Sequence, residues 1–436
     1  MSNGVPTDVQ VAKTVPARRK HPGIWTLLGA GLITGASDDD PSGIGTYAQA
    51  GAAFGFQLGW TLLVSYPLMV VIQEISARIG RTTGRGIAGN LRKHYPNWLL
   101  QSIVTLLFIA NTLNIGADLG AMAESTRLLW PHASGAFLIF FFAVLCTLPQ
   151  VFVSHQRYVG VLKGLTLVLL AYFAVLLVVR INWGEVLRHL IWPNWSLRAS
   201  FWLMVLAIFG TTISPYLFFW QAAQEVEDTR LHPERVPLRS NAAQGPSALA
   251  RIRLDTFLGM GLSNLVGLAI LITSGATIHE AGIHNITTAA DAAQALRPLA
   301  GTFAFALFAL GIIGTGLLAV PVLATSAAYA MGEARRWPVG LARRPLQAQA
   351  FYGTIAAATL LGAVANVASV NAMQALVWVA VINGMVAVPV MALLMLMATD
   401  ARILGPFTVS RTWRALGWVA TGVMALVTVG YLTSAI

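Results

Sequence analysis

The sequence predicts an all-α membrane protein that crosses the bilayer many times, and three observations support this prediction. Of the 436 residues, 56% are hydrophobic and 10% are charged, whereas soluble globular chains carry about 25% charged residues. Apolar runs of about 20 residues, the length that a helix needs to cross a bilayer, recur along the whole chain. These runs lack the alternation of membrane β-strands. The sequence therefore argues against an ordinary soluble enzyme, a disordered chain and a membrane β-barrel.

Hydrophobic spans follow one another along the chain, and we count eleven of them. The first is longer than one crossing requires, so it is expected to be tilted or broken. The residues before it form a polar, basic tail without the apolar core of a signal peptide. The predicted spans are 24–53, 59–80, 100–124, 136–153, 160–181, 200–222, 255–276, 299–325, 349–370, 375–398 and 413–434.

The basic residues predict the orientation of these spans. With the N-terminus in the cytoplasm, 23 of the 28 Lys and Arg residues fall on the cytoplasmic side, as the positive-inside rule requires. We therefore expect a multi-pass protein of the cell membrane with a cytoplasmic N-terminus and an external C-terminus. The net charge of +11 then reflects topology and contact with membrane lipids. Nucleic acid is not an expected partner, and no obligatory protein partner is inferred.

The first span contains three successive carboxylates in its middle. Asp38, Asp39 and Asp40 are followed by Pro41 and Gly43. Proline removes a backbone donor and glycine is permissive, so the helix is expected to break at this point. Ionisable groups at membrane depth are costly and usually functional. Carboxylates beside the carbonyl groups of a broken helix predict a cation site.

A second break is predicted in the sixth span, where Gly-Thr-Thr-Ile-Ser-Pro-Tyr occupies 210–216. Each break opens a set of five spans, and an odd number of spans per set means that the second set is inverted. Paired interruptions in two inverted halves indicate the binding site of a secondary transporter. The expected organisation is a cytoplasmic tail (1–22), a first five-helix repeat (23–182), an inverted second repeat (199–400) with a cytoplasmic loop (223–253), and an eleventh helix (401–436).

Other polar residues within or near the spans allow more than one role. Asp118, in the third span, is a candidate proton relay, a partner of the cation site, or an acid facing a water-filled vestibule. Asn383, in the tenth span, is equally suited to structural hydrogen bonding and to lining a site. Glu74 and Glu124 lie near span ends and are expected to be solvated. The loop 223–253 is expected to be a solvated linker, although its acids offer a surface for a partner.

The residue types near the breaks predict the kind of ion. No His or Cys accompanies the acidic cluster, and Cu and Zn prefer nitrogen and sulfur ligands. Oxygen ligands favour Mg²⁺, Ca²⁺ or Mn²⁺, and Mg²⁺ retains its water readily. The chain has no Gly-rich loop ending in Gly-Lys-Ser/Thr, which argues against an ATP-driven pump. We expect a transporter rather than an enzyme, without a permanently bound cofactor.

Several stretches resemble the Nramp family of divalent metal transporters. Asp-Pro-Ser-Gly at 40–43 resembles the helix 1 motif Asp-Pro-Gly-Asn, and the likeness continues to Trp60. Residues 76–85 resemble the end of helix 2, and residues 117–119 resemble the acidic motif of helix 3. Ser-Pro-Tyr at 214–216 stands where the family has Met-Pro-His. The resemblance implies a LeuT-type fold with the metal held between unwound helices 1 and 6.

The departures from the family pattern concern the ligands. Asp40 is kept, but Gly43 replaces the family's Asn ligand and Ser214 replaces its Met ligand. Tyr216 stands in place of the His, and Ala121 in place of the helix 3 Glu, both of which the family ties to proton movement. This pattern resembles the Nramp-related magnesium transporters. Loss of the thioether and addition of hard negative charge make a hydrated Mg²⁺ plausible.

We therefore expect import of Mg²⁺ and also Mn²⁺ with weak or no proton coupling. Asp40 is the expected anionic contact, and the resemblance implies a ligand role for the carbonyl of Thr211. Ser42 and Ser214 are candidates for direct or water-mediated contact. The further metal-site candidates are Gly43, Tyr216, Asp38, Asp39 and Asn383, with Asp118 as the candidate proton relay.

Four alternatives remain open on the sequence alone. The first is a proton-coupled Mn²⁺/Fe²⁺ symporter that uses Asp118. The second is a LeuT-type amino-acid transporter, which Asp40 disfavours because it would repel a substrate carboxylate. The third is an intramembrane aspartyl hydrolase using Asp40 and Asp118, although neither lies in a Gly-x-Gly-Asp sequence. The fourth is a metal sensor that no longer transports.

Overall fold

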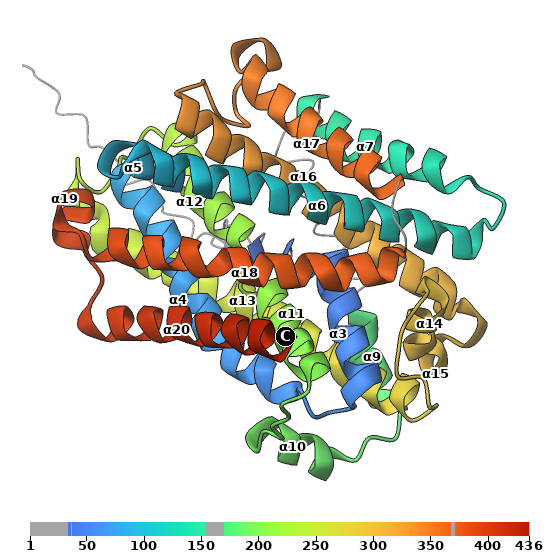
Figure 1. Cartoon of the computed structure of the whole chain (residues 1–436). Coiled ribbons are helices and arrows are strands. Elements are labelled where there is room, and N and C mark those ends of the chain that lie inside the picture. Colours follow the sequence, from blue (N-terminus) through green and yellow to red (C-terminus); the bar gives the residue numbers. More distant parts are fainter. Residues whose placement is uncertain (1–33, 36, 153–169, 368–370, 436) are drawn as a thin grey trace, which may run out of the picture.

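The protein folds into a bundle of long helices (Figure 1). The computed structural model describes residues 34–35, 37–152, 170–367 and 371–435. The longer helices are α3 (Pro41–Phe54), α4 (Gly59–Thr83), α6 (Asn97–Leu129), α7 (Gly135–Phe152), α11 (Ala199–Thr212), α12 (Pro215–Leu231), α13 (Gly245–Ser274), α16 (Ala304–Arg335), α17 (Gln349–Val367), α18 (Ala372–Thr399) and α20 (Arg411–Ser434). Shorter helices include α5 (Ile87–His94), α9 (Leu170–Val178), α10 (Trp183–Ile191), α14 (Ala289–Ala293), α15 (Arg297–Ala300) and α19 (Ala401–Leu404).

Eight helical segments in the described ranges are long and apolar enough to cross a membrane. They coincide with the second, third and sixth to eleventh predicted spans. Helix α7 supplies a shorter apolar segment, Gly135–Gln150, in the fourth span. The first and fifth spans extend into residues outside the described ranges, so the total of eleven stays a prediction. The eight segments are Gly59–Thr83, Asn97–Leu129, Ala199–Leu231, Ala242–His279, Ala289–Arg335, Gln349–Val367, Ala372–Thr399 and Arg411–Ser434.

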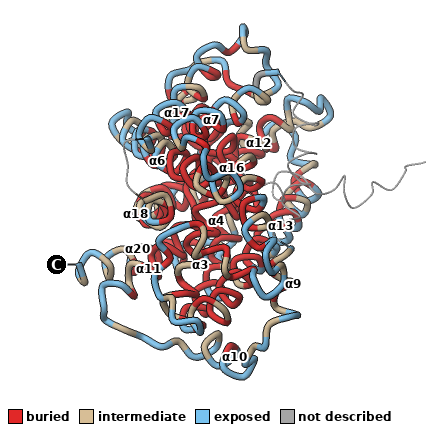
Figure 2. Tube along the Cα trace, turned by 90° about the vertical axis from the view of Figure 1, so that its right-hand side faces the viewer, coloured by how far each residue is buried: buried red, intermediate tan, exposed pale blue. Residues whose placement is uncertain are grey.

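The distribution of apolar side chains is that of a membrane protein. The middle of the bundle, around α3, α4 and α16, is almost entirely buried, and the exposed residues gather on peripheral helices (Figure 2). Large apolar side chains are nevertheless exposed on those outer helices, for example Leu361 on α17 and Val429 on α20. Contiguous exposed apolar surface of this kind would promote aggregation in water. In a bilayer, the lipid chains cover it.

The predicted break in the first span is confirmed. Helical residues lead up to Asp38, and the chain leaves the helix at Asp39 and Asp40. Asp40 has an extended backbone and is the N-cap of α3, with Pro41 at the first helical position. Both choices suit a helix start, because a carboxylate accepts from the free backbone N–H groups and proline has no N–H to leave unpaired.

The predicted break in the sixth span is confirmed as well. Helix α11 ends at Thr212, and α12 begins at Pro215 after Ile213 and Ser214. Proline again occupies the first helical position, where its missing N–H costs nothing. One span is thus divided into two helices in the centre of the bundle, where both adjoining ends are buried.

The packing of the two broken helices supports the division into two related halves. Helix α3, which follows the first break, packs on α13, the second helix of the other half. Helix α12, which follows the second break, packs on α4, the second helix of the first half. Helices α6 and α16, the third of each half, pack on each other. This reciprocal pairing is expected of an inverted repeat, while the residue limits of the halves stay a prediction.

The prediction of a long cytoplasmic loop at 223–253 is wrong in extent. Helix α12 continues to Leu231, and α13 begins at Gly245. Glu225 and Glu227 are therefore buried side chains of α12 rather than members of a solvated linker. Glu225 forms an ion pair of 2.6 Å with Arg251 of α13. The prediction failed because a charged run on a helix can face a neighbouring helix as well as solvent.

The expectation that Glu74 is solvated is also wrong. Glu74 is fully buried on α4, where its carboxylate forms an ion pair of 2.6 Å with Arg78 one turn later. Arg78 also donates to the carbonyl of Phe407 at 3.5 Å. Glu124 is half-buried and accepts a hydrogen bond of 2.8 Å from the backbone N–H of Ala289, the first residue of α14. Glu124 thus connects α6 to α14, and the partner of Glu74, Arg78, connects α4 to Phe407.

Candidate functional site

Asp40 is the centre of the candidate site. Its side chain is buried at the N-terminal end of α3. Oδ1 accepts hydrogen bonds from the Ser42 hydroxyl and the Gly43 backbone N–H, both at 2.7 Å. Oδ2 accepts one of 3.0 Å from Asn114 of α6. The partial positive charge of a helix N-terminus favours a carboxylate here. Asp40 is therefore held as an oriented acceptor between two helices.

The two breaks approach each other at Gly43 and Thr211. A Cβ atom at Gly43 would lie 3.2 Å from Thr211 Oγ1 and 3.2 Å from the Asp38 carbonyl oxygen. Any side chain at Gly43 would therefore press on the end of α11. Thr211 Oγ1 is buried and has no hydrogen-bond partner within the described ranges. Because Gly43 has no side chain, the start of α3 can lie close to the Thr211 hydroxyl at the end of α11.

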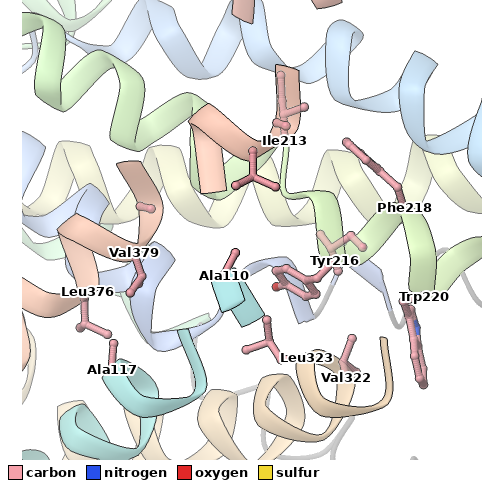
Figure 3. Close-up of a cluster of buried hydrophobic side chains, with 14 of the residues drawn as sticks. Ala110, Ala117, Ile213, Tyr216, Phe218, Trp220, Val322, Leu323, Leu376 and Val379 are labelled. Atoms are coloured by element: carbon pink, nitrogen blue, oxygen red, sulfur yellow. The ribbon is translucent and has the colours of Figure 1, made fainter. Parts of the chain in front are cut away.

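Ser214 and Tyr216 use their hydroxyl groups to hold backbone carbonyls. Ser214 Oγ lies 2.8 Å from the Gly210 carbonyl oxygen and 2.9 Å from that of Thr211. The Tyr216 hydroxyl donates to the Ser37 carbonyl at 2.9 Å. Tyr216 thereby joins α12 to the segment that precedes the first break. Figure 3 shows its ring beside Ala110 and Leu323, in the buried region between α6, α12 and α16.

Asp38 and Asp39 face a different partner from Asp40. Ser263 of α13 lies with its hydroxyl 2.7 Å from Asp38 Oδ2 and 3.2 Å from Asp39 Oδ1. Asp38 and Asp39 thus contact α13, whereas Asp40 contacts α6. In the part of the chain that the structure describes, no group of three or more His, Cys, Asp or Glu side chains is arranged to hold a metal ion.

Asp118 and Asn383 are both buried within the bundle. Asp118 lies on α6 one turn after Asn114, close enough to Asp40 for the two carboxylates to interact electrostatically. Asn383 lies on α18, which packs on α3 and α11. Its Nδ2 atom has no hydrogen-bond partner among the described residues. The structure thus places Asp118 beside the site and Asn383 on a helix that adjoins both breaks.

Two residues of this region were not predicted from the sequence, namely Asn114 and Ser263. Asn114 precedes Asp118 by four positions, so a helix places both on one face, and this spacing could have identified it. Ser263 lies beside Asn264 in an otherwise apolar span, which gives only a weak signal. Its contact with Asp38 joins residues 225 positions apart, and no local pattern encodes such a contact.

The atoms gathered around the two breaks are suited to hard cations. They comprise the carboxylate of Asp40, the hydroxyls of Ser42, Thr211 and Ser214, and the amide of Asn114. Asn114 Oδ1 is buried without a hydrogen-bond partner within the described ranges, as is Thr211 Oγ1. Oxygen atoms with free lone pairs can contact a divalent cation or the water around it. Sulfur and imidazole nitrogen are absent from this set.

The interrupted helices and the reciprocal packing define a multi-pass membrane protein of the LeuT type. Solved structures with this arrangement include the Eremococcus coleocola manganese transporter, with a TM-score of 0.74, 17% identity, and coverage of 98% of this chain and 90% of that chain. Mhp1, a nucleobase-cation-symport-1 family transporter, has a TM-score of 0.61 and 17% identity, with 94% and 90% covered. At these identities the likeness establishes the fold.

The chain belongs to the Nramp family. The family model described as natural resistance-associated macrophage protein-like matches residues 31–434. A protein of Ralstonia nicotianae named divalent metal cation transporter MntH is 27% identical over 308 residues, covering 67% of this chain and 66% of that relative. An Aeromonas hydrophila protein of the same name is 26% identical over 312 residues, covering 70% and 71%. These matches confirm the resemblance that the sequence motifs indicated.

Proposed function

We propose that the protein imports hard divalent cations, Mg²⁺ and also Mn²⁺, across the cell membrane. The central observation is the placement of Asp40, whose carboxylate lies between α3 and α6 and is hydrogen-bonded to Ser42, Gly43 and Asn114. An anion at this point offers the ion a partner midway through the bundle. The names of the relatives support transport of divalent metals.

The proposed preference for Mg²⁺ is supported by the atoms at the second break. Ser214 and Thr211 present hydroxyl and carbonyl oxygen, where the family's helix 6 motif has a thioether. Oxygen suits Mg²⁺, which keeps part of its hydration shell and needs no soft ligand. In this proposal Asp40 contacts the ion or its water, and Thr211, Ser42 and Ser214 complete the lining. Gly43 presents no side chain toward Thr211, and the loss of the family's Asn and Met ligands supports the likeness to the Nramp-related magnesium transporters.

Weak or absent proton coupling belongs to the same proposal. Tyr216 stands where the family has His, and its hydroxyl proton is donated to the Ser37 carbonyl. Ala121 stands where the family has a helix 3 Glu. The membrane potential can drive the ion instead, because each charge gains about 2.3 kcal/mol per 100 mV, or about 4.6 kcal/mol for a divalent ion.

The other proposed features concern the way in which the chain lies in the membrane. We infer a cytoplasmic N-terminus and an external C-terminus from the positive-inside rule. The repeats at 23–182 and 199–400 would then enclose the transport path, with the helix at 401–436 on the outside of the bundle. Asp38, Asp39 and Asn383 would act around the path rather than as primary contacts, because Asp38 and Asp39 are engaged by Ser263.

A second candidate is a proton-coupled Mn²⁺ symporter. It is favoured by Asp118, a buried acid within electrostatic range of Asp40, and by the similarity to the Eremococcus coleocola manganese transporter. In this alternative, Asp118 takes up a proton as the ion enters, which compensates for the missing His and Glu.

Flux into proteoliposomes separates the two candidates. One set of vesicles holds a Mg²⁺-sensitive dye and a parallel set holds a pH dye, each with the unmodified protein, Asp40→Ala or Asp118→Asn. Our proposal predicts Mg²⁺ entry without a change of pH, loss of entry in Asp40→Ala and retained entry in Asp118→Asn. Mn²⁺ entry with stoichiometric acidification, no Mg²⁺ entry and loss of acidification in Asp118→Asn would instead establish the symporter.

A further inference from the structure

Two histidines meet at the C-terminal end of α3, far from the candidate transport site. His279 ends the short π-helix Gly275–His279 that continues α13, and His284 lies in the segment that follows. Their Nδ1 atoms are 3.3 Å apart, and their ring centroids are 4.8 Å apart. Both Nδ1 atoms also approach the carbonyl oxygen of Ala52, at 2.7 Å from His279 and 3.4 Å from His284.

Hydrogen bonding links all three atoms only if one N–H group is shared between two acceptors. A neutral imidazole carries one proton on one of its two nitrogens. If His279 Nδ1 donates to the Ala52 oxygen, the same N–H must also be shared with the lone pair of His284 Nδ1 for all three atoms to be linked. If His284 Nδ1 carries the proton as well, two N–H groups face each other. A cation placed between the three atoms accepts a lone pair from each of them.

The spacing is close to that of a tetrahedral metal site. Zinc binds imidazole nitrogen at about 2.0–2.1 Å in tetrahedral geometry, which places two ligand atoms about 3.3 Å apart. The separation between the two nitrogens and the longer separation from Ala52 match this edge. The remaining edge, 2.7 Å between His279 and Ala52, requires a small rotation of the His279 ring. His284 is exposed, so water can reach the ion and complete its coordination.

The surrounding chain holds the two histidines in place. Gln49 of α3 donates from Nε2 to the His284 carbonyl at 3.3 Å, and its Oε1 accepts from the Ile286 N–H at 2.7 Å. Gly55 has a φ of 57°, and a Cβ there would lie 3.3 Å from the His279 ring. The turn after α3 therefore leaves room for this ring. Gln49 thus positions the backbone of the segment that carries His284.

We propose that His279, His284 and the Ala52 carbonyl bind a borderline divalent cation of the Zn²⁺ type. This site is distinct from the oxygen-lined one, because twelve residues of α3 place it about 18 Å from Asp40. The bound ion would link the end of α3 to the segment after α13. It would thereby slow the relative movement of these two elements and, with it, transport. The effect on transport rests on the proposed function, whereas the binding of the ion does not.

Calorimetric titration of the purified full-length protein with Zn²⁺ tests the binding directly. The expected result is one site that is retained in Asp40→Ala and in the control variant His189→Ala, a histidine of α10. His279→Ala and His284→Ala should each weaken that site at least tenfold, and Gln49→Leu should weaken it less. Equal Zn²⁺ affinity in the unmodified protein and both histidine variants would overturn the proposal.

Flux measurements test the consequence for transport separately. Zn²⁺ added on the side of the membrane that carries His279 and His284 should slow Mn²⁺ entry through the unmodified protein. This slowing should be lost in His279→Ala and His284→Ala. If Zn²⁺ binds through the histidines but does not slow entry, the binding site stands and the link to movement is overturned. If no protein transports Mn²⁺, the proposed function fails, and the titration still decides whether the site exists.

Discussion

At the scale of single residues, Ser214 supplies a hydroxyl oxygen at the second break. Its hydroxyl lies 2.9 Å from the Thr211 carbonyl oxygen, so a side chain at this position directly adjoins the polar region between the breaks. A thioether placed there would introduce a soft donor, which favours soft and borderline ions over Mg²⁺.

Ser214→Met should therefore change selectivity. The ratio of Cd²⁺ to Mg²⁺ uptake is expected to rise about tenfold, which corresponds to about 1.4 kcal/mol. Competition uptake in proteoliposomes measures this ratio. Ser214→Leu is the matched control, because leucine has a similar volume and lacks sulfur. An equal ratio in the Met and Leu variants would show that Ser214 does not face the ion.

Asn114 carries a second prediction at the same scale. Its Nδ2 donates to Asp40 Oδ2 at 3.0 Å, and hydrogen bonds to charged groups contribute about 1.5–3 kcal/mol. Asn114→Leu should therefore reduce Mg²⁺ uptake at low ion concentration by about tenfold or more. Thr112→Val is the control, because Thr112 donates to the Phe108 carbonyl within its own helix. Unchanged uptake in Asn114→Leu would remove Asn114 from the site.

These residues mark the limit of inference from sequence. Asp40 and the first break were predictable because proline, glycine and an acid in an apolar run act locally on the helix. The division of Asp38 and Asp39 from Asp40 was not predictable, because Ser263 comes from α13. The hydroxyl bonds of Ser214 and Tyr216 to backbone carbonyls likewise depend on the path of the chain after the break.

At the scale of elements, α12 and α13 are joined by a buried charge pair. Glu225 is 1% exposed and lies 2.6 Å from Arg251. Asp228, also on α12, lies 3.8 Å from the same guanidinium group. The sequence predicts a solvated loop for these acids because a charge pattern alone does not distinguish a solvated face from one that packs on a basic helix. The pair thus connects the second half of a broken helix to its neighbour.

Arg251→Gln should destabilise the protein by about 3 kcal/mol, because it leaves the Glu225 carboxylate buried without its partner. Unfolding in mixed detergent micelles measures the change. The double variant Glu225→Gln/Arg251→Gln should recover part of the loss, since no buried charge is then left unpaired. Arg344→Gln, at an exposed position, is the control and should leave stability nearly unchanged. Equal stability of Arg251→Gln and this control would contradict the proposed role of the pair.

The whole molecule combines features that the sequence predicts well with others that it predicts poorly. Span positions were predictable because a helix in lipid needs a long apolar run. The fold class followed from the spacing of the two breaks and from family motifs, and the family match over residues 31–434 confirms it. The contacts between the halves, such as α3 on α13 and α12 on α4, required the structure, because apolar runs do not specify which helices are neighbours.

The orientation of the molecule is open to a direct test. The distribution of Lys and Arg predicts that the C-terminus, after α20, lies outside the cytoplasm. A C-terminal fusion to alkaline phosphatase should therefore be active, and a C-terminal fusion to green fluorescent protein should be dark. Fusions after α16, whose C-terminal end is expected in the cytoplasm, should give the reverse pattern. A fluorescent C-terminal fusion would contradict the predicted topology.

Competition between Mg²⁺ and Mn²⁺ tests most directly the central claim that the oxygen-lined site at Asp40 carries hard cations. Mn²⁺ entry into proteoliposomes would be measured at increasing external Mg²⁺, alongside Mg²⁺ entry itself. We predict that Mg²⁺ inhibits Mn²⁺ entry over the same concentration range in which Mg²⁺ enters, and that Asp40→Ala abolishes both fluxes. Mn²⁺ entry that persists unchanged in a large excess of Mg²⁺, with no Mg²⁺ entry, would contradict this claim.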